Sequence, residues 1–176
     1  SKLAVAIQAE NYADTGRVAL FTCNADGTLT FDKVYETGVQ PDMVTFASND
    51  SKILTADEGE PRDGYGDGII DPKGTVTIIN LADQTVSQVD FTSYDNSDSR
   101  EQLVESGVIL KKNTNPSVDF EPEYIAVGDK TAYVTLQEAN AIAVIDLNQQ
   151  SLTGVYSAGY EDYSTCAVDI DKKDEA

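Results

Sequence analysis

The sequence contains no His and no Trp, only one Met and only two Cys among its 176 residues. Without His, a Ser-His-Asp triad, a Cys-His dyad and a His-ligated zinc or haem site are all excluded. The cysteines, Cys23 and Cys166, lie far apart and form no Cys-x-x-Cys motif, so they indicate no disulfide framework. Two interpretations remain: two small buried apolar residues, or one bridge between the ends of the chain, which would imply an oxidising compartment.

Basic residues are also scarce, because 12 Lys and Arg stand against 31 Asp and Glu, a formal charge of −19. This charge excludes nucleic acid as a partner, since phosphate binding needs clustered Lys and Arg. It suits a cationic partner, and a hard cation such as Ca²⁺ is the simplest one. No apolar run approaches the ~18 residues of a membrane span, so we expect no membrane insertion in this segment. The hydrophobic fraction of 40% and its alternating pattern indicate a folded chain.

An internal repeat is the most informative pattern in the chain. Residues 74–81 align with residues 140–147, and the match continues without a gap from 82–89 onto 148–155. Each unit is typical of a strand, a polar turn and a second strand. A weaker third copy covers residues 17–31, where Asp26-Gly27 between two apolar runs favours a hairpin.

A second pattern recurs upstream of two of these units. Residues 41–56 and 122–136 each contain a short strand, a polar turn and another strand. One full repeat is therefore four short antiparallel strands, and four strands per ~40–45 residues is the signature of a propeller blade. The sequence predicts an all-β fold, an array of four-stranded antiparallel blades like those of a β-propeller.

About three blades are expected, interrupted by two insertions, and the second insertion is expected to contain one short helix at residues 97–107. The predicted boundaries are blade one 1–40, blade two 41–92 with an acidic insertion 57–73, an inter-blade insertion 93–120, blade three 121–158 and the start of a next blade 159–176. In this alignment blade one is expected to begin one strand late. Because propellers close with about four to eight blades, we expect the remaining blades to come from a longer protein or from another chain.

Several segments resemble one family of propeller proteins. They are residues 41–46, 54–62, 71–81 and 120–147. The sequence is similar to the choice-of-anchor I group of secreted bacterial surface proteins, some of which carry alkaline-phosphatase names, and to the mesenchyme-specific cell-surface glycoproteins of echinoderms. The resemblance implies an extracellular propeller longer than 176 residues. Asp57 departs from the pattern, since the family usually has Asn there, and no catalytic residues can be carried over.

The acidic insertion is the main candidate metal site. Calcium needs six to eight hard oxygens and Gly residues that let the backbone fold around the ion. The segment does not match an EF-hand loop, because Tyr65 and Gly74 stand where ligands are required. A different calcium loop is the hypothesis, and a solvated Gly-rich surface loop is the alternative. The candidate ligands are Asp63, Asp67 and Asp71, with Asp57, Glu58 and Glu60 at the start of the insertion.

Other acidic residues form two further groups. Asp42, Glu121 and Glu123 lie at the starts of predicted innermost strands, so we expect them near the axial channel, where they serve channel polarity or, in the alternative, acid-base work. The hairpin of Gln137, Glu138 and Asn140 occupies the place where blade two carries its acidic insertion, and it would add oxygens to the candidate metal site if the blade loops converge. The C-terminal acids are interpreted as a solvated end. These are Glu161, Asp162, Asp169, Asp171, Asp174 and Glu175.

One glycosylation sequon is present, at Asn49-Asp50-Ser51 in a predicted exposed turn, so Asn49 is a candidate glycan site. The leading functional hypothesis is a non-enzymatic extracellular or cell-surface propeller. Its acidic, calcium-binding surface would make contacts with matrix, cells or biomineral. Two alternatives stay open: a calcium-dependent phosphatase or phytase-like hydrolase, and a structural subunit of an oligomer or fibre.

Overall fold

The computed structural model describes residues 1–66, 68–160 and 164. Within them the chain forms three antiparallel sheets, each built from strands that are consecutive in sequence. The first sheet contains β1 (Lys2–Ile7), β2 (Thr15–Cys23) and β3 (Leu29–Val39). The second contains β4 (Pro41–Ala47), β5 (Lys52–Asp57), β6 (Thr75–Asn80) and β7 (Thr85–Val89). The third contains β8 (Pro122–Val127), β9 (Thr131–Leu136), β10 (Ala141–Asp146) and β11 (Ser151–Ser157).

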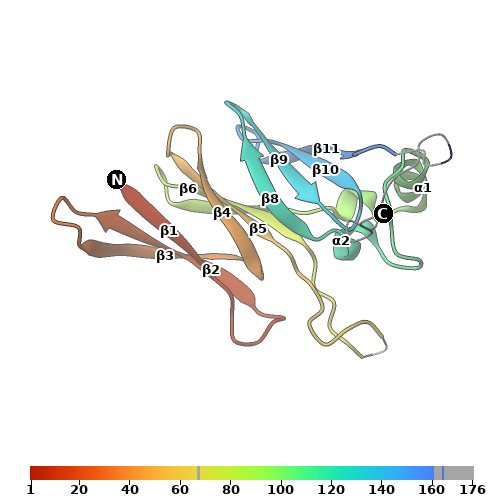
Figure 1. Cartoon of the computed structure of the whole chain (residues 1–176), viewed down its shortest axis with the longest axis horizontal. Coiled ribbons are helices and arrows are strands. Elements are labelled where there is room, and N and C mark those ends of the chain that lie inside the picture. The colour runs from red at the N-terminus through yellow and green to blue at the C-terminus, as the bar shows by residue number, and fades with distance from the viewer. Residues whose placement is uncertain (67, 161–163, 165–176) are drawn as a thin grey trace, which may run out of the picture.

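The three sheets follow one another along the long axis of the molecule and do not close into a ring (Figure 1). The predicted all-β, blade-like architecture is therefore confirmed. The second and third sheets have four strands and the first sheet has three. The repeated sequence units became equivalent strands, because the aligned residues 74–81 and 140–147 form β6 and β10, the third strand of each sheet.

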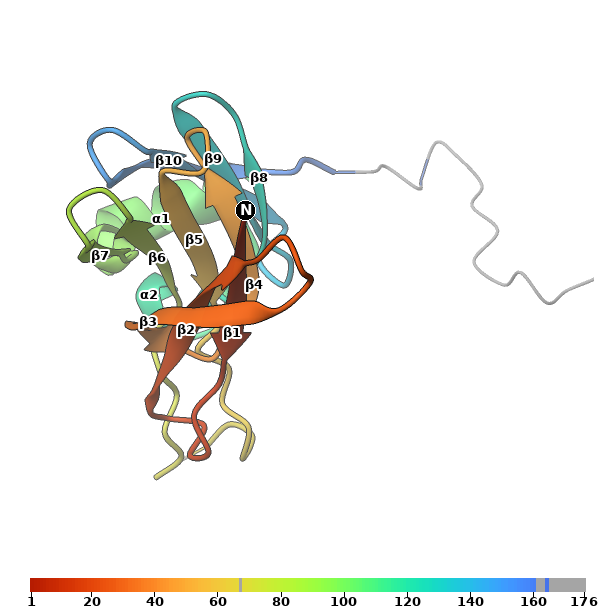
Figure 2. The ribbon, with the colours of Figure 1, turned by 90° about the vertical axis from the view of Figure 1, so that its left-hand side faces the viewer.

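Two apolar layers hold the sheets together. A small cluster that includes Val18, Tyr35, Ile53 and Ile79 fills the space between the first and second sheets. A larger cluster lies between the second and third sheets, with Leu54, Val134 and Ile145 among its fully buried members. Figure 2, seen from the first sheet, shows the sheets one behind another with the helices on the side of β6 and β7. All the residues of β6 except the last are buried, as expected for a strand with a sheet on either face.

The segment between the second and third sheets contains a 3₁₀ turn, η1 (Thr92–Tyr94), and two helices, α1 (Ser97–Glu105) and α2 (Pro116–Asp119). The predicted helix is α1, and Gly107 follows it with a φ of 100°. The four-residue α2 was not predicted. Leu103 of α1 and Val108 join the larger core cluster, so this segment is part of the core. No helix among the described residues is long and apolar enough to span a bilayer.

The cap of α1 offers a local test of this arrangement. The side chain of Asn96 accepts a hydrogen bond from the backbone N–H of Ser99 at 2.9 Å. We expect Asn96→Ala to lower the free energy of unfolding by about 1 kcal/mol, because one N–H of the first turn loses its acceptor. Asn96→Asp is the matched control and should be close to neutral. Urea denaturation of the three proteins measures the difference, and equal midpoints for Asn96→Ala and the parent would contradict it.

Cys23 is half-buried at the end of β2. Its candidate partner Cys166, the acidic C-terminal residues and the predicted start of a next blade lie outside the described residues, apart from residues 159, 160 and 164. The candidate glycan site Asn49 is exposed in the turn between β4 and β5, where Ser48, Asn49 and Asp50 all have positive φ. Its glycosylation stays a prediction.

Candidate functional site

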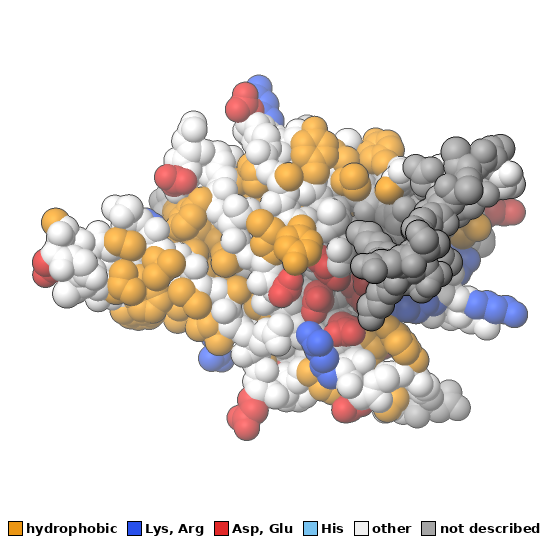
Figure 3. Space-filling view, in the orientation of Figure 1, with side chains coloured by type: hydrophobic (Ala, Val, Ile, Leu, Met, Phe, Trp, Pro, Cys, Tyr) orange, Lys and Arg blue, Asp and Glu red, His pale blue; other side chains and the backbone are white. Residues whose placement is uncertain are grey.

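Carboxylates from the second and third sheets converge at one end of their inner strands. β4 and β8 begin at this end and β5 and β9 finish at it, so residues at these boundaries are brought together. We call this group of side chains the acidic mouth. Its members are Asp42, Glu58, Glu60, Glu121, Glu123 and Glu138. Figure 3 shows acidic side chains gathered near the centre of the face, with a basic side chain beside them.

Gln40 fixes the backbone at the entrance to the acidic mouth. This buried residue lies between β3 and β4 with a φ of 55°. Its amide nitrogen donates to the carbonyl oxygens of Glu60 at 2.6 Å and Tyr12 at 3.1 Å. Its backbone carbonyl accepts from the N–H of Glu58 at 3.0 Å. Hydrogen bonds to Gln40, which lies between the first and second sheets, therefore hold the start of the acidic insertion in place.

Arg62 is the nearest cation to the acidic mouth. Its guanidinium lies 3.1 Å from the carboxylate of Glu58 and 2.7 Å from that of Glu60, and it donates to the side-chain oxygen of Gln40 at 3.0 Å. Burial nevertheless raises the pKa of Glu58 to about 7; Arg62 opposes the shift, and the charges of Asp42, Glu60 and Glu123 add to it. Arg62 alone therefore does not offset the burial of Glu58 and the repulsion from its neighbouring carboxylates.

Lys111 occupies the inner side of the acidic mouth. Its ammonium donates to the hydroxyl of Tyr65 at 2.9 Å and to Glu121 at 3.1 Å, and lies 4.4 Å from the centre of the Tyr65 ring. Burial would lower the pKa of Lys111, but these hydrogen bonds and the nearby carboxylates outweigh it and raise the pKa. Burial raises the pKa of Glu121 against the effect of Lys111, and Glu138 and Glu60 add to the rise. Lys111 thereby connects the acidic insertion to the start of β8.

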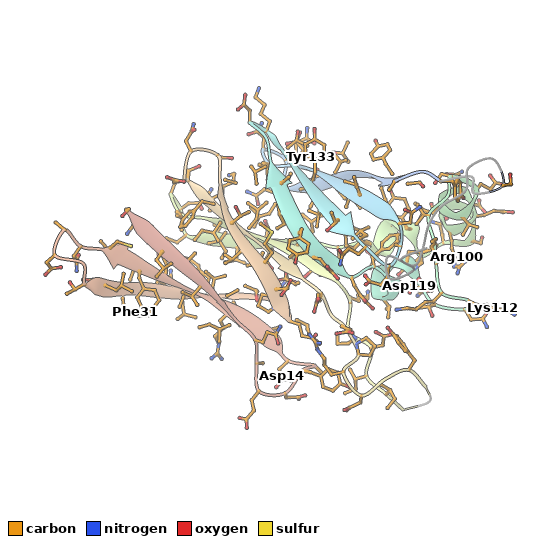
Figure 4. All side chains as sticks on the ribbon, in the orientation of Figure 1. Asp14, Phe31, Arg100, Lys112, Asp119 and Tyr133 are labelled. Carbon is orange, nitrogen blue, oxygen red and sulfur yellow. The ribbon has the colours of Figure 1, made fainter. Side chains whose placement is uncertain are left out.

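Two further carboxyl groups, those of Asp119 and Asp71, lie close to Lys111. Asp119 lies at the end of α2 next to β8 (Figure 4) and is buried. Its Oδ2 accepts from the backbone N–H of Lys111 at 2.6 Å. Its Oδ1 forms an ion pair with the Lys111 ammonium at 3.3 Å, although the geometry is not that of a hydrogen bond. Burial raises the pKa of Asp71, whereas Lys111 lowers it. Lys111 is thus shared among three carboxyl groups.

Asp57 lies apart from the acidic mouth, in the interior between the first and second sheets. Its side chain is fully buried and accepts hydrogen bonds from the hydroxyls of Thr55 at 2.7 Å, Thr75 at 2.9 Å and Thr77 at 2.6 Å. Burial raises its pKa to about 6, against the opposing effect of the three hydroxyls. A Cβ on Gly38 would come within 2.6 Å of its Oδ2, so β3 approaches Asp57 closely. The oxygens of this carboxylate already have protein partners.

The structure therefore distributes the candidate calcium ligands of the insertion over several places. Glu58 and Glu60 belong to the acidic mouth, Asp71 lies near Lys111, and Asp57 is buried elsewhere. Asp63 is exposed and lies near Tyr12, whose pKa is raised first by desolvation and then by the charge of Asp63. Asp67 lies outside the described residues. Among the described residues no group of three or more Asp, Glu, Cys or His is arranged to hold a metal ion.

The β9–β10 hairpin lies beside the channel acids Glu121 and Glu123. Glu138 acts electrostatically on Glu121, and Gln137 donates a side-chain hydrogen bond to Glu123. Sequence reasoning missed the two cations of the site. Arg62 had a signal, because it follows Glu58 by four residues, whereas Lys111 had none, because it approaches Glu121 only through the folded path of residues 93–120.

The fold and its relatives define the class of the chain as a propeller-type β domain. A family model for the choice-of-anchor I domain matches residues 1–176, and the chain belongs to this family. No curated protein matches it. Hydrazine synthase of Kuenenia stuttgartiensis is structurally similar, with 12% identity, a TM-score of 0.56, and coverage of 89% of this chain and 46% of that one. A chain of a nidogen/laminin complex aligns at 13% identity and a TM-score of 0.47, covering 89% and 43%. The chain thus spans less than half the length of both structures.

Proposed function

We propose that this choice-of-anchor I chain is part of a non-enzymatic extracellular propeller that binds cations, Ca²⁺ first among them, at the acidic mouth. The observation that supports this proposal is the convergence of six carboxylates from two sheets on a region with two cations, Arg62 and Lys111. A bound cation would relieve their mutual repulsion, and this is the physical basis of the expected affinity. Contacts with a positively charged matrix or mineral surface would use the same carboxylates.

The expected affinity is low. Because the described residues contain no preassembled metal-ligand group, binding must first draw the carboxylates together. Extracellular calcium modules commonly have dissociation constants of about 10⁻⁴ to 10⁻³ M. Glu58 has a pKa of about 7, so it takes up a proton as the pH falls below neutrality. Binding should therefore release protons near pH 7 and weaken towards pH 6.

Thermal unfolding with Ca²⁺ tests this proposal. With a dissociation constant of about 1 mM, 10 mM Ca²⁺ would add about 1.4 kcal/mol and raise Tm by roughly 3–6 °C at pH 8. NaCl at equal ionic strength is the control for screening. We expect the double variant Glu58→Gln/Glu123→Gln to lose the Ca²⁺-dependent increase in Tm, because two carboxylates of the acidic mouth lose their charge.

A second double variant distinguishes the acidic mouth from the later part of the insertion, residues 61–73. Asp63→Asn/Asp71→Asn removes the same number of charges and should keep the Ca²⁺-dependent increase in Tm. If this variant loses the increase and the Glu58/Glu123 variant keeps it, calcium binds in residues 61–73 of the insertion and the proposed location is wrong. If the parent protein shows no increase beyond that of NaCl, the calcium proposal itself is wrong.

A further inference from the structure

Lys111 differs from the carboxylates around it in how far its side chain is exposed. Its ammonium lies 3.1 Å from Glu121 and 3.3 Å from Asp119, and its side chain is 35% exposed. The side chains of Asp119 and Glu121 are only 4% and 8% exposed. A lysine has a flexible four-carbon stem, so its ammonium is able to turn towards solvent while the two carboxylates stay in place. The cation is therefore the exchangeable member of this group.

Local structure holds Asp119 and Glu121 in position. Asp119 is the last residue of α2, and its Oδ2 accepts from the backbone N–H of Lys111 at 2.6 Å. Because this bond uses the backbone, it persists when the Lys111 side chain moves. Ser117 of α2 is fully buried and donates to Asp95 through its N–H at 2.9 Å and its hydroxyl at 2.8 Å. Glu121 directly precedes β8, so the fold positions both carboxylates.

One oxygen of Asp119 indicates a cation independently of the number of charges nearby. Its Oδ1 is buried, and no hydrogen bond from any described residue reaches it. Most buried polar oxygens accept a hydrogen bond, and a place for an ion is one of the recognised explanations of an exception. This explanation is favoured here because the Lys111 ammonium already lies beside Oδ1, in an ion pair without the geometry of a hydrogen bond.

The second cation of the acidic mouth, Arg62, is bound differently. Its partners Glu58 and Glu60 have side chains that are 17% and 39% exposed, and the guanidinium uses a separate nitrogen for each of them. A guanidinium presents its donors in a rigid planar fork, whereas an ammonium is a compact point charge. A metal ion is also a compact charge, so it is able to replace the Lys111 ammonium without a rearrangement of the carboxylates beside it.

We propose that Lys111 is a built-in competitor of the divalent cation, and that Ca²⁺ takes the place of its ammonium between Asp119 and Glu121. This role of Lys111 rests on the function proposed above, and it makes Asp119 a further ligand at the inner side of the acidic mouth. Glu60 and Glu138, which act electrostatically on Glu121, add to the attraction. The apparent affinity falls with the fraction of molecules in which the ammonium occupies this place.

Tb³⁺, a luminescent substitute for Ca²⁺, tests where the cation binds. The Lys111 ammonium lies 4.4 Å from the centre of the Tyr65 ring. A Tb³⁺ ion in the place of the ammonium would therefore lie beside this ring and emit when tyrosine is excited. We expect such emission from the parent protein, and Ca²⁺ should abolish it by displacing Tb³⁺. Tyr65→Phe should lose most of the emission, while calorimetry still detects Tb³⁺ binding.

Substitution of Lys111 tests the competition. Lys111→Met should bind Ca²⁺ about tenfold more tightly than the parent protein, as expected if the ammonium occupies its place in about 90% of molecules. Lys112→Met is the matched control, because it removes the same charge from the adjacent residue, which is exposed and lies away from Asp119 (Figure 4). Its affinity should stay within about twofold of the parent value, because solvent and salt screen an exposed charge. Lys111→Arg keeps the charge and should also stay close to the parent.

The outcomes separate this proposal from the calcium proposal itself. If the parent protein binds Ca²⁺, equal affinities of Lys111→Met and Lys112→Met, or full emission from Tyr65→Phe, would overturn the role of Lys111 alone. Binding by Lys111→Met and not by the parent would support the competition and contradict calcium binding as the function. No binding by any of these proteins would overturn both. If Lys111→Met does not fold, the loss of emission in Tyr65→Phe supports the proposal and full emission overturns it.

Discussion

Phe120→Ala should lower the free energy of unfolding by about 3–5 kcal/mol, a large part of the 5–15 kcal/mol typical of a domain. Phe120 follows α2 and is fully buried, and its ring lies edge-on to that of Phe91 with the centroids 5.2 Å apart. Phe91 follows β7 and is equally buried. Truncation leaves a cavity between the second and third sheets, which the β-strands on either side cannot close.

Urea denaturation measures this loss, with Phe31→Ala as the matched control. Phe31 lies on the outer face of the first sheet, is 57% exposed and also makes an edge-on contact, with Phe21 at 5.8 Å. We expect its truncation to lower the free energy of unfolding by less than about 1.5 kcal/mol. The double variant Phe91→Ala/Phe120→Ala should lose less than the sum of the single losses, because the pair shares one contact. Similar losses for Phe31→Ala and Phe120→Ala would contradict this account of the core.

The packing of Phe91 and Phe120 in the core was not predictable from the sequence. Strand patterns and the repeat predicted the sheets, because the matching short apolar segments that form residues 75–80 and 141–146 can be recognised from local sequence alone. The segment 93–120 has no such periodicity, so it was interpreted as an insertion between blades. Its contribution to the core depends on long-range packing of residues such as Leu103, which no local pattern specifies.

Part of the candidate site was likewise predictable from local sequence pattern, and part of it was not. Strand ends predicted that Glu121, Glu123 and Asp42 would lie near one another, because equivalent strands begin at equivalent positions. The pairing of Lys111 with Glu121 depends on the folded path of an aperiodic segment, and it was not predictable. Asp57 was grouped with the insertion acids by adjacency. However, the period of two in β5 places it on the same face as Thr55 and the buried Ile53, a signal that was available.

Asp57→Asn should make the protein more stable at pH 8 by up to about 3 kcal/mol and leave its stability near pH 4 almost unchanged. Burial raises the pKa of Asp57 in the folded state to about 6 from the ordinary 3.8. Between these values the folded state binds more protons than the unfolded state, so stability falls as the pH rises from about 4 to about 6 and then levels off. Each pKa unit corresponds to about 1.4 kcal/mol, and the variant removes this loss.

The hydrogen bonds around Asp57 are compatible with the replacement of its carboxylate by the amide of Asn. The hydroxyl of Thr77 accepts from the N–H of Gly38 at 3.0 Å and so must donate to residue 57. The Asn side chain is expected to place its oxygen towards Thr77 and Thr75 and its amide nitrogen towards Thr55, whose hydroxyl is able to accept. The three hydroxyls and the amide oxygen then each keep a partner, and no buried charge remains.

Urea unfolding of the parent protein and of Asp57→Asn at pH 4, 6 and 8 tests this prediction. Glu58, Asp71 and Glu121 also have raised pKa values, but both proteins contain them. The difference between the two proteins in the free energy of unfolding therefore reports on Asp57 alone. Asp83→Asn is the control. The carboxylate of Asp83 accepts a hydrogen bond from the hydroxyl of Thr85, and this bond is the main reason why the pKa of Asp83 is lowered. The change in stability with pH that this substitution removes should therefore have the opposite sign to that of Asp57→Asn. A loss of stability for Asp57→Asn at pH 8, or parallel curves for variant and parent, would show that the three threonines stabilise the ionised carboxylate fully.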